Sequence, residues 1–166
     1  MLLSGAIVKS PDLKVIIGLI ILVALLFGSA LMSASEVAYF SFRPEDIENF
    51  RINRSKKSQT VLKLYNKPEK LLSTILVANN TINITFVLLS AFISARMFDF
   101  SAKPVFGFIV EAVAITFILL FFGEIMPKVY ASKNNVSMAV FMAFPLVFLE
   151  KIFSPVTSLL ILSSNF

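Results

Sequence analysis

Long stretches without a charged residue are the feature that most constrains how this chain can fold. Val15–Met32 has 18 consecutive uncharged residues and Leu71–Ala95 has 25. A helix of about 20 apolar residues crosses the hydrocarbon core of a bilayer, so both stretches are long enough to span one. A third stretch, Pro104–Gly123, is interrupted only by Glu111. The chain is therefore predicted to be an all-α membrane protein whose apolar surface faces lipid.

The composition agrees with a membrane domain and restricts its chemistry. Of the 166 residues, 57% are hydrophobic and 15% are charged, whereas soluble domains carry about a quarter charged residues. The chain has no Cys and no His, which excludes disulfides, zinc–thiolate sites and the usual general base at neutral pH. No Ser–base pair can be placed, so the chain is not expected to be an enzyme. A bound metal must be held by oxygen, which favours hard cations such as Mg²⁺, Ca²⁺ or Na⁺.

Basic residues are concentrated in one loop. Eight of the 15 lie between Arg43 and Lys70, and only two lie in the loop Arg96–Lys103. The positive-inside rule places the first loop in the cytoplasm, with the N-terminus outside and the C-terminus cytoplasmic. This loop also explains the net charge of +5 without nucleic acid as a partner, because a DNA-binding protein needs a soluble scaffold for its basic face.

The expected organisation is one transmembrane domain over residues 1–166. Its three spans are expected at about 15–40, 69–95 and 104–126, with a cytoplasmic helical loop at 43–67. A signal peptide is the alternative for the first span, but the apolar run exceeds the roughly 7–15 residues of a signal core. Pro44 and Pro68 have the first-turn position that begins a helix.

The last part of the chain, 136–166, is expected to form juxtamembrane helices. Val136–Leu149 and Ile152–Phe166 are each too short to cross a bilayer alone. Joining them into one span would place Glu150 and Lys151 in hydrocarbon, at a cost of several kcal/mol on insertion scales. We therefore expect two helices that lie along the membrane interface or pack around the spans.

Polar residues at the end of the first span form the first candidate cluster. Ser29, Ser33 and Glu36 lie on one helical stripe, whereas Ser35 points elsewhere. Small residues also let membrane helices pack closely, and this alternative stays open for the serines.

Three asparagines in the second span form the second cluster. Asn79 and Asn83 are four residues apart and share a face, and Asn80 is displaced by about 100°. A single Asn often only bonds a neighbouring helix, but each buried amide needs partners, and three of them favour a polar cavity or an ion site.

The third cluster surrounds a proline in the third span. Pro127 has no backbone N–H, so it cannot bond the carbonyl of Gly123, four residues earlier. That carbonyl lies beside the carboxylate of Glu124, and the two oxygens together would form half of a site for a hard cation. The alternative is a simple proline kink in which Glu124 pairs with Lys128.

The three clusters, taken in order, resemble the transmembrane domain of the CorC/cyclin M family of Mg²⁺ transporters. The resemblance rests on Ser33-Ala-Ser35-Glu36, Asn79-Asn80-Thr-Ile-Asn83 and Gly123-Glu124-Ile-Met-Pro127-Lys128. It implies a homodimer of three-span protomers in the plasma membrane and Mg²⁺ export coupled to Na⁺ entry. The family's cytoplasmic CBS modules are expected to lie outside this chain.

The resulting hypothesis is an intramembrane Mg²⁺ site that works by alternating access. The expected metal ligands are Ser29, Ser33, Asn79, Asn83, Gly123 and Glu124, and the expected supporting or gating residues are Ser35, Glu36, Asn80, Pro127 and Lys128. Two other functions stay open: a membrane sensor that regulates another Mg²⁺ transporter, and a scaffold whose polar residues only hold helices together.

Overall fold

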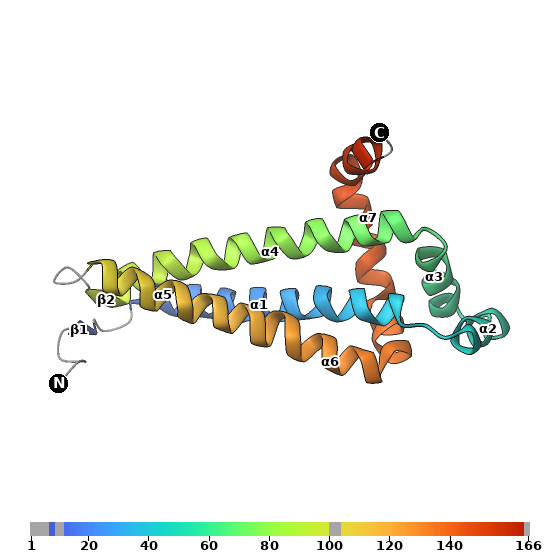
Figure 1. The fold of residues 1–166 in the computed structure, drawn as a ribbon, viewed down its shortest axis with the longest axis horizontal. Helices are drawn as coiled ribbons and strands as arrows, with labels where there is room; N and C mark the ends of the chain where they lie inside the picture. Colours follow the sequence, from blue (N-terminus) through green and yellow to red (C-terminus); the bar gives the residue numbers. More distant parts are fainter. Residues whose placement is uncertain (1–6, 9–11, 100–103, 165–166) are drawn as a thin grey trace.

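Three long helical segments lie side by side in the computed structural model, which describes residues 7–8, 12–99 and 104–164 (Figure 1). The first two are α1 (Leu13–Phe40) and α4 (Pro68–Met97). The third is built from α5 (Pro104–Ile118), the π-helical segment η1 (Leu119–Ile125) and α6 (Met126–Lys133). Residues 100–103 of the expected outer loop, and 165–166 at the end of the expected juxtamembrane region, lie outside the described residues.

The helices have the length and composition of membrane spans. Within the described residues, four are long and apolar enough to cross a bilayer: Leu13–Phe40, Pro68–Met97, Pro104–Lys133 and Asn135–Thr157. The chain is thus a multi-pass all-α membrane protein. The fourth of these belongs to α7 (Asn135–Ser164), which runs across the other three near one end of the bundle (Figure 1). This direction agrees with the expected juxtamembrane position, and three crossings stay the prediction.

The expected division of residues 136–166 into two helices is wrong, because α7 is continuous over Asn135–Ser164 and contains Pro145 and Pro155. The division was inferred from the charges in its middle. In the structure Glu150 pairs with Lys70 at 2.7 Å between Nζ and Oε1, and the Lys151 side chain is exposed. A charge that is paired or exposed does not require the helix to end.

Two short helices form the basic loop at the end of the bundle where α7 crosses (Figure 1). Helix α2 (Pro44–Ile52) begins at its proline, and Asp46 accepts a bond from the Arg43 backbone N–H at 2.9 Å. Helix α3 (Lys56–Tyr65) begins after Ser55, whose side chain accepts from the Ser58 N–H at 3.1 Å. Proline and side-chain caps of this kind fix where short helices begin.

Tyr39 lies in the apolar core that joins α1 to α7 and the basic loop. Its side chain is fully buried, and its hydroxyl donates to the Ala139 carbonyl at 3.2 Å. Phe42 packs edge-on against the Tyr39 ring, and Phe50 packs edge-on against Phe42. Elsewhere most large apolar side chains on the long helices are exposed, as a lipid environment requires.

A pair of short strands lies at the opposite end of the bundle. Strand β1 (Ile7–Val8) pairs antiparallel with β2 (Phe98–Asp99), which directly follows α4. The sequence does not predict this pair, because two residues are too few to show an alternating pattern.

Candidate metal centre

Ser29, in the middle of α1, is the point at which the polar side chains of the bundle meet. It is fully buried, and its Oγ lies 2.6 Å from Asn83 Oδ1 and 3.1 Å from Asn79 Oδ1. Both amides are on α4, one turn apart. A hydroxyl has one proton, so Ser29 can fully satisfy only one of the two amide oxygens. Ser29 Oγ and the two amide oxygens thus form a close group of three oxygens, the type of ligand that hard cations take.

The third segment joins this group through Glu124. Asn83 Nδ2 lies 3.5 Å from Glu124 Oε1, at the outer limit of a hydrogen bond. Asn83 therefore contacts α1 through its oxygen and η1 through its nitrogen. The structure brings Ser29, Asn79, Asn83 and Glu124 together, and their role as metal ligands stays a prediction.

Gly123 is buried directly against the serine. A Cβ atom built on Gly123 would lie 3.0 Å from Ser29 Oγ, closer than a side chain can normally approach. The absence of a side chain lets the backbone of η1 come this near to α1. The Gly123 backbone is therefore part of the same group of residues.

The helix that carries Gly123 and Glu124 is widened there into η1. The Met126 N–H bonds to the Phe121 carbonyl, five residues earlier, and Pro127 follows with no N–H to donate. The interruption that Pro127 predicts is thus a π-helical turn, a feature that often occurs at functional sites. The π-helical form could not be predicted from the sequence, although the spacing from Gly123 to Pro127 indicates where the helix is interrupted.

Ser33 offers a second hydroxyl one turn after Ser29. Its side chain is 1% exposed, and Oγ has no hydrogen-bond partner among the described residues. Ser35, by contrast, donates to the Leu31 carbonyl of its own helix at 2.7 Å. A buried hydroxyl without such a bond destabilises the fold, which makes Ser33 the clearest candidate to bind a ligand such as a cation.

An ion pair closes the end of this region nearer to α7. Glu36 Oε2 on α1 lies 3.1 Å from Lys128 Nζ on α6, and both side chains are about 40% exposed. Among the described residues no ion pair joins Lys128 to Glu124, so the alternative of a simple kink closed by that pair is wrong. Within the described part of the chain, Glu124 forms no ion pair with a lysine or arginine side chain.

Two of the predicted supporting residues do not join the group. Asn80 is exposed, and Ser35 bonds its own helix. Glu111, whose Oε1 is buried without a partner among the described residues, lies 13 residues before Glu124, about 20 Å along a helix. The described residues also contain no cluster of three or more His, Cys, Asp or Glu side chains. A metal here would be held mainly by neutral oxygens.

The cyclin M transmembrane N-terminal domain model matches residues 20–166, nearly the whole chain. This chain belongs to that family. All three clusters fall within the matched residues. The chain is 31% identical over 141 residues, or 85% of its length, to a UPF0053 protein of Haemophilus influenzae, covering 32% of that protein. It is 27% identical over 132 residues, or 80% of its length, to the UPF0053 inner membrane protein YfjD of Escherichia coli, covering 30% of it. The chain thus spans about a third of the length of these relatives.

Proposed function

We propose that this domain transports Mg²⁺ across the membrane through a site between α1, α4 and η1. The observation that carries the proposal is the meeting of Ser29, Asn79, Asn83 and Glu124 inside the bundle. Membership of the cyclin M family supports a role in membrane metal-ion transport. The resemblance of the three motifs to Mg²⁺ transporters of this family supports the choice of ion.

The spacing of the oxygens suits a small hard cation. Mg²⁺ takes six oxygens at 2.0–2.1 Å in an octahedron, in which neighbouring oxygens are about 2.9 Å apart. The hydrogen-bond distances of 2.6 and 3.1 Å from Ser29 Oγ to the two amide oxygens are compatible with that separation. Ser33 Oγ and the Gly123 carbonyl are the further neutral ligands, and Glu124 supplies the carboxylate. One carboxylate among neutral oxygens would bind Mg²⁺ without preventing its release.

Alternating access is the transport mechanism that we propose. The Glu36–Lys128 pair would close the path toward the α7 end, and the π-helical turn before Pro127 would act as the hinge. The basic loop supports a cytoplasmic position for this end, with the N-terminus outside. Export, Na⁺ coupling, a homodimer and regulation by CBS modules follow from the family resemblance and form part of the proposal.

Mg²⁺ flux from loaded proteoliposomes tests this function, and α4 offers a matched pair of variants. Asn83→Ala removes an amide that contacts both Ser29 and Glu124, whereas Asn80→Ala removes an exposed amide three residues away. We expect Asn83→Ala to lower the flux at least about ten-fold, because loss of a metal-site group typically costs 10–100-fold. Asn80→Ala should transport like the native protein.

Three other outcomes would contradict the proposal. Equal flux in the two variants would remove Asn83 from the mechanism. Mg²⁺ binding without any flux would favour the sensor function. No rise in thermal stability with Mg²⁺ would favour the scaffold, because a ligand at 100 times its Kd adds about 2.7 kcal/mol.

A further inference from the structure

A basic pocket lies outside the metal centre, where α3, α4 and α7 meet. Its volume is about 340 Å³, and it is lined by Lys63, Lys67, Lys70, Val147, Glu150, Lys151 and Ser154. Four lysines and a single glutamate give the lining a formal charge of +3. Such a pocket attracts an anion, and its volume is sufficient for a phosphoryl group.

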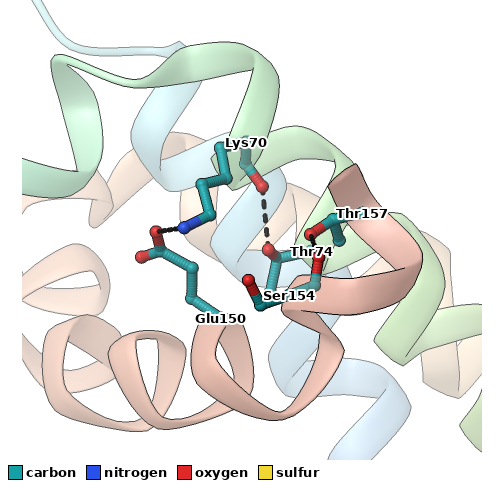
Figure 2. Close-up of polar contacts among 5 residues, drawn as sticks. All are labelled: Lys70, Thr74, Glu150, Ser154 and Thr157. Atoms are coloured by element: carbon teal, nitrogen blue, oxygen red, sulfur yellow. Dashed lines mark hydrogen bonds and ion pairs between the residues drawn. The ribbon is translucent and has the colours of Figure 1, made fainter. Parts of the chain in front are cut away.

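The Lys70–Glu150 ion pair forms one side of this pocket. Lys70 Nζ and Glu150 Oε1 are 2.7 Å apart, and they join the start of α4 to the middle of α7 (Figure 2). In the described part of the chain, the lysines at 63, 67 and 151 form no ion pair. Three ammonium groups thus face one pocket whose single carboxylate is already paired.

Two threonine hydroxyls close to the pair already donate hydrogen bonds to backbone carbonyls. Thr74 Oγ1 donates to the Lys70 carbonyl at 2.8 Å, and Thr157 Oγ1 donates to the Ser154 carbonyl at 3.2 Å (Figure 2). Both threonines are therefore occupied by backbone. Ser154 is itself one of the residues that line the pocket, so it adds a polar residue to the lysines there.

Exposed aromatic side chains on α7 indicate which phosphoryl compound fits. Phe148 and Phe144 precede Lys151 by one turn and two turns, so all three lie on one side of the helix. Phe148 is 65% exposed and Phe144 is 51% exposed. A soluble phosphate would contact the lysines and leave both rings bare. A phospholipid would place its headgroup among the lysines and its acyl chains against the rings.

We propose that this pocket binds the headgroup of an anionic phospholipid, with the acyl chains packed along Phe144 and Phe148. The lipid would connect α3, α4 and α7 and so hold α7 across the end of the bundle. The site shares no residue with the metal centre, and the inference does not depend on Mg²⁺ transport.

Lipid-dependent thermal stability of the full chain in detergent tests the site. The probes are phosphatidylglycerol, phosphatidylcholine and inorganic phosphate. The pocket variant is Lys67→Gln with Lys151→Gln, which leaves the Lys70–Glu150 pair intact. The control variant, Lys56→Gln with Lys133→Gln, removes the same charge from exposed lysines that do not line the pocket.

We expect phosphatidylglycerol to raise the unfolding temperature of the native and control proteins, and phosphatidylcholine and inorganic phosphate to have little effect. The pocket variant should bind phosphatidylglycerol about thirty-fold more weakly, because each lysine near an anionic lipid contributes about five-fold. Equal weakening in both variants would show general surface attraction and overturn the site. Stabilisation by inorganic phosphate as strong as that by phosphatidylglycerol would overturn the assignment to a lipid.

Discussion

Ser33 combines a hydroxyl that lacks a hydrogen-bond partner with a proposed role as a metal ligand. Its hydroxyl is buried without a partner among the described residues, and the neighbouring Ser35 bonds its own helix. An unpaired buried hydroxyl costs about 1–3 kcal/mol. A cation bound by Ser33 Oγ would remove this cost.

Ser33→Ala is therefore expected to change stability and binding in opposite directions. Without Mg²⁺ the variant should be as stable as the native protein or more stable by about 1 kcal/mol, because the unpaired group is gone. Its affinity for Mg²⁺ should fall at least about ten-fold. Thermal unfolding with and without Mg²⁺ measures both quantities. A variant that is less stable without Mg²⁺ and binds the ion normally would refute this account of Ser33.

Gly123 supports a second prediction, because its lack of a side chain sets the distance between the η1 backbone and Ser29. Gly123→Ala would place a Cβ 3.0 Å from Ser29 Oγ, so the hydroxyl must move by a few tenths of an ångström. We expect about a ten-fold loss of Mg²⁺ affinity.

Gly28→Ala is the control for this substitution, because its Cβ would meet Ile82 Cδ1 at an ordinary 3.4 Å. Isothermal titration with Mg²⁺ compares the two variants. Similar affinities would mean that the close approach of Gly123 to Ser29 has no part in binding.

The contacts between helices could be predicted only in part from the sequence. Spans and polar clusters could be predicted, because each depends on residues close together in the chain. The continuity of α7 could not, because Glu150, the charge that argued against it, is paired with Lys70, 80 residues away in the chain. The alternative in which Lys128 pairs with Glu124 on its own helix is likewise not found, since Lys128 pairs with Glu36 on α1.

The Glu36–Lys128 pair supplies a prediction about how α1 and α6 move. Lys128→Glu would place two carboxylates next to each other, and their repulsion would separate the helices at that end. The rate of Mg²⁺ transport should therefore fall several-fold. The double variant Glu36→Lys with Lys128→Glu should restore most of the native rate. Proteoliposome flux measures both variants, and Mg²⁺ affinity should stay near native because neither residue is a proposed ligand. A double variant no better than the single one would show that the pair itself does not control the path.

The candidate metal centre and the basic end have separate positions along the bundle. Ser29 and Asn83 lie in the middle of α1 and α4. Helices α2, α3 and α7 gather at one end (Figure 1). The composition and the charge asymmetry were sufficient to predict a multi-pass helical domain. The short apolar runs after residue 135 predicted a segment along the membrane interface, in agreement with the direction of α7. They did not predict its contacts with α1, because these join residues far apart in the chain, such as the Tyr39 hydroxyl and the Ala139 carbonyl.

The central claim is that one cation binds where α1, α4 and η1 meet. Anomalous X-ray diffraction from crystals grown with Mn²⁺ tests it directly, because Mn²⁺ shares the oxygen ligands of Mg²⁺ and scatters anomalously. We predict a single strong anomalous peak among Ser29, Asn83 and Glu124, weakened when Mg²⁺ is added in excess. An anomalous peak elsewhere in the bundle, with none at this point, would contradict the account.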